Sequence, residues 1–291
     1  MSQIRLFFTE DKDVARTIGD LLFERFDEGE FPISVFETNQ DSGTWAVSLY
    51  VEEEDADRIE NEVHEYLALS GYSNTFEREI IEETDWVTKT LQDLAPVRAG
   101  RFIVHGSHDN NIPKSHEHSV IINAGQAFGT GHHGTTAGCL DMLGECLKRQ
   151  TYKNALDLGT GSGVLAIALA KALPIKILAS DIDPIATKTA RDNTIINSVA
   201  SQINCITATG FNHRGFADAG SFDLIIANIL ARPLQDLAHP MSAYLAPHAT
   251  VILSGLLPHQ KARICATYRL QGLKLEKAHI RDGWLTLVLT K

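Results

Sequence analysis

A chain of 291 residues, 44% of them hydrophobic, is long enough to form two packed domains. It contains no apolar run near the ~20 residues of a membrane-spanning helix, and residues 1–10 lack the basic-then-apolar layout of a signal peptide. We therefore expect a cytoplasmic protein with no membrane contact.

The net charge of −11 is unevenly distributed along the chain. Residues 1–95 hold 24 acidic and 7 basic side chains, whereas residues 96–291 hold 13 acidic and 19 basic side chains. Summed charge steers association over about a Debye length, so the acidic part is expected to repel nucleic acid and to favour a basic partner. The alternative interpretation is an acidic surface that serves only solubility.

The cysteines and histidines predict no metal site and no disulfide framework. The four cysteines show no C-x-x-C spacing, which indicates reduced thiols. His116-Glu117-His118 and His132-His133 lack companion ligands at a recognisable spacing.

Residues 1–84 are predicted to form a small recognition domain. Strands are expected at residues 4–8, 33–37, 44–51 and 76–82, and helices at 11–26 and 55–69, from apolar alternation and helical spacing. Thr9 is the candidate cap of the first helix. The order β-α-β-β-α-β is the split βαβ pattern of ferredoxin-like domains. The domain has no nucleophile-and-base pair and no glycine loop, so catalysis is not expected there.

A linker helix is predicted within residues 85–97, and a second domain follows at 98–291. Strands at 101–105 and 119–123 precede a segment, residues 125–136, that holds four glycines. We interpret this segment as a loop around a ligand, with Phe128 as an aromatic wall and Thr135 or Thr136 starting a helix at 137–149. A threonine-capped surface loop without a ligand is the alternative.

Residues 154–165 are predicted to form a buried strand, a glycine turn and the start of a helix. Gly159, Gly161 and Gly163 let the backbone approach a ligand, and the helix at 164–173 directs its N-terminus toward that ligand. The next strand, 176–180, leads to Asp181, whose carboxylate can accept both ribose hydroxyls of an adenosine-type ligand.

The remaining pattern predicts an α/β sheet with its ligand at one edge. Strands are expected at residues 203–207, 222–228 and 250–253, followed by a final pair at 273–279 and 284–290. Ligands in such sheets bind outside the carboxyl ends of the strands, and Gly159, Asp181, Asn228 and Ser254 fall there.

The glycine spacing separates two cofactor classes. Nicotinamide enzymes use G-x-G-x-x-G, whereas here Asp157 precedes G-x-G-x-G. This arrangement resembles the class I S-adenosylmethionine-dependent methyltransferases, and Asp181 matches their ribose-binding acid. A dehydrogenase is the competing interpretation, but no proton donor is placed for hydride chemistry.

Five motifs in chain order carry a narrower resemblance. They are residues 127–136 (AFGTGHHGTT), 157–165 (DLGTGSGVL), 181–184 (DIDP), 228–231 (NILA) and 253–257 (LSGLL). Together they resemble the PrmA family of ribosomal protein methyltransferases, which modify amino groups of large-subunit ribosomal protein L11. The resemblance extends over the acidic domain and the linker. It departs at residues 123–125, where the family usually has Pro-Gly, and at His132, which is an additional histidine.

This resemblance implies the fold and the site. The fold would be a Rossmann-like, doubly wound class I methyltransferase domain after the ferredoxin-like domain. Asn228 would position the amine, with Ile229 and Leu230 beside it, and no metal would be needed. The implied cofactor residues are Thr136, Asp157, Gly159, Gly161, Asp181 and Asn228, with Phe128, Gly129, Thr130 and Gly131 over the methionine end.

The implied activity is protein-lysine N-methylation with S-adenosylmethionine as methyl donor. The substrate would be lysine side chains or the N-terminal amine of ribosomal protein L11, free or in the ribosome. Two alternatives stay open: a lysine methyltransferase of the same fold acting on another protein, and a non-catalytic ribosome-assembly protein.

Overall fold

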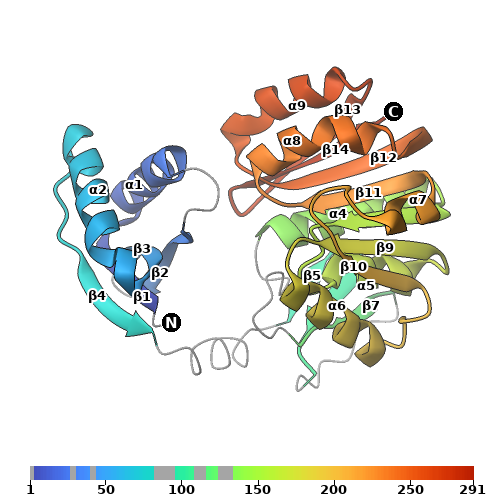
Figure 1. Ribbon diagram of the computed structural model, residues 1–291, viewed down its shortest axis with the longest axis horizontal. Coiled ribbons are helices and arrows are strands. Elements are labelled where there is room, and N and C mark those ends of the chain that lie inside the picture. The colour runs from blue at the N-terminus through green and yellow to red at the C-terminus, as the bar shows by residue number, and fades with distance from the viewer. Residues whose placement is uncertain (1–2, 27–30, 40–43, 82–95, 108–115, 124–133) are drawn as a thin grey trace. The chain divides into compact units, whose positions relative to one another are not determined.

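The computed structural model describes residues 3–26, 31–39, 44–81, 96–107, 116–123 and 134–291 (Figure 1). They belong to two compact units, Met1–Lys89 and Thr90–Lys291. This division falls inside the segment 85–97 that the sequence marks as a linker. The helix predicted there lies in residues 82–95, outside the described part of the chain.

The first unit is a four-stranded antiparallel sheet with two helices. Its sheet has the order β2-β3-β1-β4. Its elements are β1 (Gln3–Asp11), α1 (Lys12–Arg25), β2 (Ile33–Asn39), β3 (Thr44–Glu52), the 3-10 turn η1 (Glu53–Asp55), α2 (Ala56–Leu69) and β4 (Glu77–Ile81). The predicted order β-α-β-β-α-β is therefore confirmed.

Alternating side chains give this unit its core. Leu6 from β1 and Leu49 from β3 are fully buried with Ile18 from α1 and Val63 from α2, so both helices cover the same face of the sheet. The cap of α1 is Asp11, whose carboxylate accepts hydrogen bonds from the amides of residues 13 and 14 at 3.0 and 3.1 Å. The prediction of Thr9 as the cap was wrong, because β1 continues to Asp11.

The second unit is built on a seven-stranded sheet of order β10-β9-β8-β11-β12-β14-β13. Its strands are β8 (Asn154–Leu158), β9 (Lys176–Asp181), β10 (Ile203–Thr207), β11 (Phe222–Asn228), β12 (Leu245–Leu256), β13 (Lys274–Arg281) and β14 (Trp284–Thr290). All neighbouring strands from β10 to β12 run parallel, and β14 runs antiparallel to both of its neighbours. The predicted doubly wound α/β sheet is confirmed.

Helices cover both faces of this sheet (Figure 1). One face carries α4 (Gly134–Arg149), α5 (Val164–Ala172) and α6 (Pro184–Ile196), and the other carries α7 (Arg214–Ala219), α8 (Ala231–Ser242) and α9 (Lys261–Arg269). The central strands have helices on both sides, so β8 and β11 are almost continuously buried along their lengths. Each face therefore has its own hydrophobic core.

Two features of the second unit escape the sequence pattern. The strands predicted at residues 101–105 and 119–123 are confirmed as β6 (Phe102–His105) and β7 (His118–Ile121), but they belong to a separate three-stranded sheet with β5 (Val97–Ala99), which is too short to show a period. Helix α4 begins at Gly134, three residues before the predicted start. The earlier start places Thr135 and Thr136 inside the first helical turn.

Sheet order places the ligand edge at the centre of the second unit. Strand β8 lies between β9 and β11, so successive connections leave it in opposite directions. The carboxyl ends of these strands form a crevice at such a topological switch point. The residues after β8, β9, β11 and β12 meet there.

Candidate active site

Backbone hydrogen bonds and three glycines determine the conformation of the turn after β8. The amides of Gly159 and Thr160 both donate to the Ser180 carbonyl, at 2.8 and 2.9 Å. Gly159, Gly161 and Gly163 have φ of 73°, 53° and 86°, a region that side chains disfavour. The sequence prediction of a strand, glycine turn and helix is confirmed here.

Asp157 lies beneath this turn and is 2% exposed. Its Oδ2 accepts hydrogen bonds from Thr160 Oγ1 at 2.6 Å and from the Ala166 amide at 3.0 Å. Its Oδ1 is buried and has no hydrogen-bond partner among the described residues. Burial raises the pKa of Asp157 to about 6, against the opposing effect of those two hydrogen bonds. The turn therefore lies above a buried carboxylate with an unused acceptor.

Asp181 ends β9 and faces the same turn. Its Oδ2 accepts a hydrogen bond from the Gly161 amide at 2.8 Å, and its Oδ1 accepts one from the Asp183 amide at 3.1 Å. The next residue, Ile182, is 67% exposed although it is apolar. The sheet thus brings Asp181 against the glycine turn, with an exposed apolar side chain beside it.

Thr136 and Asn228 lie 92 residues apart in sequence and are in contact. The Asn228 carboxamide nitrogen donates to Thr136 Oγ1 at 3.2 Å, and Thr136 is fully buried. Asn228 pairs in register with Ser254 at the end of the parallel strands β11 and β12. Two residues that the sequence assigns separately to the site are therefore joined.

A hydrogen-bond chain fixes the start of α4 beside this pair. Ser254 Oγ donates to the Thr135 carbonyl at 3.1 Å and lies 2.9 Å from Thr286 Oγ1. Ser254 is completely buried and Thr286 is 1% exposed. Sequence reasoning missed the role of Thr286, because only the antiparallel placement of β14 brings it to this edge.

Ile229, directly after β11, lies against Gly159 after β8 and against Gly255 near the end of β12. A Cβ atom on Gly159 would lie 2.2 Å from Ile229 Cγ2, and one on Gly255 would lie 2.4 Å from the Ile229 carbonyl oxygen. Gly255 has φ of 82°. Glycine at both positions is thus required by close approach as well as by backbone conformation.

The predicted loop residues Phe128, Gly129, Thr130 and Gly131 lie in segment 124–133, outside the described residues. Residues 3–26, 31–39, 44–81, 96–107, 116–123 and 134–291 contain no group of three His, Cys, Asp or Glu side chains placed to hold a metal ion. Within the same ranges, no helix is both long and apolar enough to cross a bilayer.

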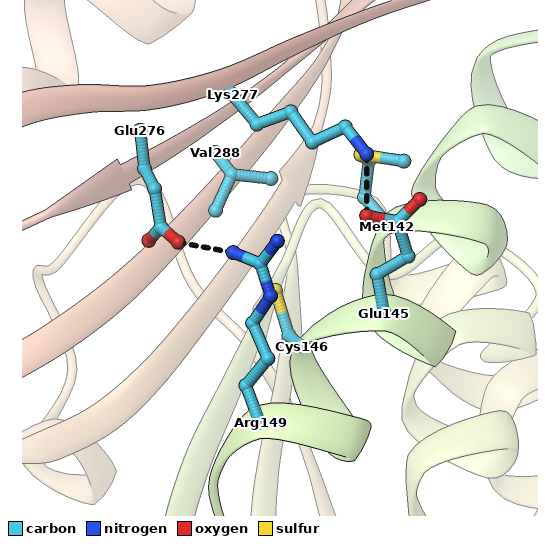
Figure 2. Close-up of a pocket in the computed structure, with 7 residues that line it drawn as sticks. All are labelled: Met142, Glu145, Cys146, Arg149, Glu276, Lys277 and Val288. Carbon is cyan, nitrogen blue, oxygen red and sulfur yellow. Dashed lines mark hydrogen bonds and ion pairs between the residues drawn. The ribbon is translucent and has the colours of Figure 1, made fainter.

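A small cavity between α4 and β13 is lined by none of the residues at the carboxyl ends of the strands described above. Figure 2 shows Arg149 paired with Glu276 and Lys277 paired with Glu145 around it, each pair at 2.5 Å. Its volume of about 10 Å³ is room for roughly one water molecule. The two ion pairs hold α4 to β13, and the cavity is too small for a cofactor.

The described site offers two carboxylates, glycine amides and a buried polar pair. Asp157 and Asp181 both lie against the glycine turn. A dinucleotide would place its anionic pyrophosphate at such a turn, where the buried Asp157 carboxylate beneath it is unfavourable to a negative charge. A cationic ligand is attracted there instead, so the geometry favours a sulfonium cofactor over a nicotinamide dinucleotide.

Comparisons with known proteins agree with this geometry. Residues 17–291 match the family model described as ribosomal protein L11 methyltransferase (PrmA). Proteins named ribosomal protein L11 methyltransferase from Rhizobium meliloti (strain 1021) and Rhizobium johnstonii are 46% and 47% identical to this chain over 291 residues, covering all of both chains.

A solved structure is similar as well. The crystal structure of a ribosomal protein L11 methylase from Lactobacillus delbrueckii subsp. bulgaricus aligns with a TM-score of 0.59 and 28% identity. The alignment covers 68% of this chain and 99% of the other. The second unit therefore has the class I methyltransferase fold that the strand order indicates.

Proposed function

The chain belongs to the ribosomal protein L11 methyltransferase (PrmA) family, and from that premise we propose that it transfers methyl groups from S-adenosylmethionine to amino groups of ribosomal protein L11. Lysine side chains or the N-terminal amine are the acceptors, and the reaction takes place in the cytoplasm. The observation that carries the proposal is the cluster of Asp157, Asp181, Thr136 and Asn228 at one sheet edge.

The residues present fit this cofactor. Buried Asp157 has an unpartnered oxygen below the turn, which favours a positive charge above it. Gly159, Gly161 and Gly163 all have positive φ, so the turn adopts a backbone conformation that residues with side chains disfavour and that lets its amides approach a ligand. When bound, S-adenosylmethionine supplies a methyl group activated by its positively charged sulfur.

Each end of the cofactor has candidate partners. Asp181 would accept the ribose hydroxyls, and exposed Ile182 would cover one face of the adenine ring. Gly159, Gly161 and Thr136 would hold the methionine end together with residues 128–131. These assignments are supported by the position of Asp181 against the Gly161 amide and of Thr136 against Asn228.

The amine must be neutral and aligned to accept a methyl group. An unperturbed lysine has a pKa of about 10.4, so an apolar environment that disfavours the charged form assists the reaction. Ile229 is half-buried and Leu230 is 47% exposed, directly after Asn228. Because the Asn228 nitrogen donates to Thr136, its oxygen is the group that would accept an amine hydrogen. We assign Asn228 to positioning the amine.

We assign residues 1–84 to recognition of the substrate, residues 85–97 to the linker and residues 98–291 to methyl transfer. The ferredoxin-like assignment of the first domain is supported by its element order and its β2-β3-β1-β4 sheet.

The first unit has a surplus of acidic side chains. Four arginines each form an ion pair with a carboxylate of the same unit: Arg5, Arg25, Arg58 and Arg78. With 24 acidic and 7 basic side chains in residues 1–95, most carboxylates have no basic residue in this part of the chain to pair with. That surplus favours a basic protein partner over nucleic acid.

Calorimetric titration with S-adenosylmethionine tests the cofactor assignment. We expect the wild-type protein to bind and Asp181→Ala to lose most of its affinity. The proposal fails if the folded wild-type protein shows no binding and the substitution changes nothing.

A further inference from the structure

Helix α6 contacts the glycine turn through a residue that lacks a side chain. A Cβ atom on Gly163 would lie 3.1 Å from Ala190 Cβ and 3.2 Å from Ala190 Cα. Ala190 is fully buried on α6. The turn and the helix therefore approach so closely that a larger residue at position 163 would force one of them to shift, and the face of α6 that contains Ala190 packs against the glycine turn.

One helical turn further along α6, Asn193 bonds to the turn itself. Its carboxamide nitrogen donates to the Ser162 carbonyl at 2.9 Å, and its carboxamide oxygen accepts from the Asn123 amide at 3.1 Å. The residue is 1% exposed. A buried amide is costly unless its polar atoms are paired, and here both ends of the amide are used.

The bond to Ser162 constrains the most adaptable part of the turn. The peptide that joins Ser162 to Gly163 is planar, so its carbonyl and its N–H move together. Asn193 holds the carbonyl, and the Gly163 N–H donates to the Thr160 carbonyl at 2.9 Å. Glycines on both sides of Ser162 adopt several backbone conformations at little cost, so the sequence alone does not fix this peptide. The bond from Asn193 to the Ser162 carbonyl adds an external constraint to the internal bond between Gly163 and Thr160, and together the two favour one orientation of the peptide.

The neighbouring Asn197 provides an internal comparison. It is 2% exposed, and its side chain pairs with the amide and carbonyl of Ile121 at 3.0 and 2.6 Å. Its carboxamide thus pairs with the backbone of Ile121 as a neighbouring strand would, and connects the end of α6 to β7. None of its hydrogen bonds reaches residues 159–163. Two buried asparagines, one helical turn apart, differ in whether they touch the glycine turn.

We propose that Asn193 is a positioning residue for the methyl-transfer reaction, which presets the glycine turn for S-adenosylmethionine. This inference rests on the proposed function. Without Asn193, the peptide between Ser162 and Gly163 samples other orientations, and binding must select the competent one. The apparent affinity of the protein for the cofactor then falls in proportion to the fraction of molecules whose turn has the binding-competent orientation.

The test compares Asn193→Ala, Asn193→Asp and Asn197→Ala with the full-length wild type. Calorimetry measures binding of S-adenosylmethionine well below each unfolding midpoint. We expect Asn193→Ala and Asn193→Asp to bind about tenfold more weakly, a loss comparable to one hydrogen bond. Asn197→Ala should lower the unfolding midpoint but keep the affinity within about threefold.

Asn193→Asp is informative because it keeps the acceptor for Asn123 and removes the donor to Ser162. It also carries the test alone if Asn193→Ala does not fold. Steady-state kinetics add a second readout: a positioning role raises KM for S-adenosylmethionine, whereas a purely structural loss lowers only the active fraction.

Equal affinity losses in Asn193→Ala and Asn197→Ala, or wild-type affinity in Asn193→Asp, would overturn the inference. Absence of binding to the wild-type protein is a different result, which would refute the proposed cofactor instead.

Discussion

Replacing Asp157 with asparagine should change the pH dependence of stability in a defined direction. The carboxylate is 2% exposed, and burial raises its pKa from 3.8 to about 6. The folded protein therefore binds this proton more tightly than the unfolded chain does. Stability from this group is fully present below the unfolded pKa and is lost as the pH rises through the folded pKa.

The size of the effect follows from that difference in pKa. A shift of about two units corresponds to about 3 kcal/mol between the fully protonated and fully ionised limits. Between about pH 4.5 and about pH 8, the expected loss is about 2 kcal/mol. At neutral pH the ionised Asp157 carboxylate thus lowers the free energy of unfolding, which is consistent with a residue that serves ligand binding and not stability.

Urea unfolding of the wild-type protein and Asp157→Asn at both pH values measures the effect. The difference between the two proteins removes the contribution of every other titrating group. We expect the wild type to lose about 2 kcal/mol relative to Asp157→Asn as the pH rises, and Asp157→Asn to bind S-adenosylmethionine more weakly. A difference that is independent of pH, or that grows in favour of the wild type with rising pH, would refute the reasoning.

Three further outcomes are expected. Gly159→Ala should destabilise the protein by more than the roughly 1–2 kcal/mol of left-handed strain, because its Cβ would lie 2.2 Å from Ile229 Cγ2. In urea titrations, adding Ile229→Ala should recover part of that loss, and strictly additive effects would contradict the proposed contact. Asp181→Ala should abolish most cofactor affinity in calorimetry, whereas Asp183→Ala, which removes the cap of α6, should cost about 1 kcal/mol of stability with little change in affinity. Association with ribosomal protein L11, followed by stopped-flow, should slow as salt is raised, and a salt-independent rate would count against steering by the acidic domain.

Local patterns were sufficient to predict the frame of the site. The apolar strand before Asp157, the alternating glycines and the acid at the end of the next strand each have a physical signature within about ten residues of sequence. The structure confirms β8, the turn and β9 with boundaries that agree within a residue or two. These elements are predictable because short-range sterics and burial determine them.

Contacts between distant segments could not be predicted in this way. Thr286 reaches Ser254 only because β14 runs antiparallel inside the sheet, and Asn193 reaches Ser162 only because α6 packs on Gly163. A buried asparagine in a helix has no sequence signature that separates a structural role from a positioning role. The cap of α1 is a smaller example. Sequence alone did not show that β1 extends to Asp11, and this extension makes Asp11, and not Thr9, the cap.

Mass spectrometry of ribosomal protein L11 after incubation with this protein and S-adenosylmethionine tests the central claim most directly. We expect the mass of the substrate to rise in steps of one methyl group, and Asp181→Ala to reduce this rise greatly. An unchanged substrate mass in the presence of folded wild-type protein that binds S-adenosylmethionine would contradict it.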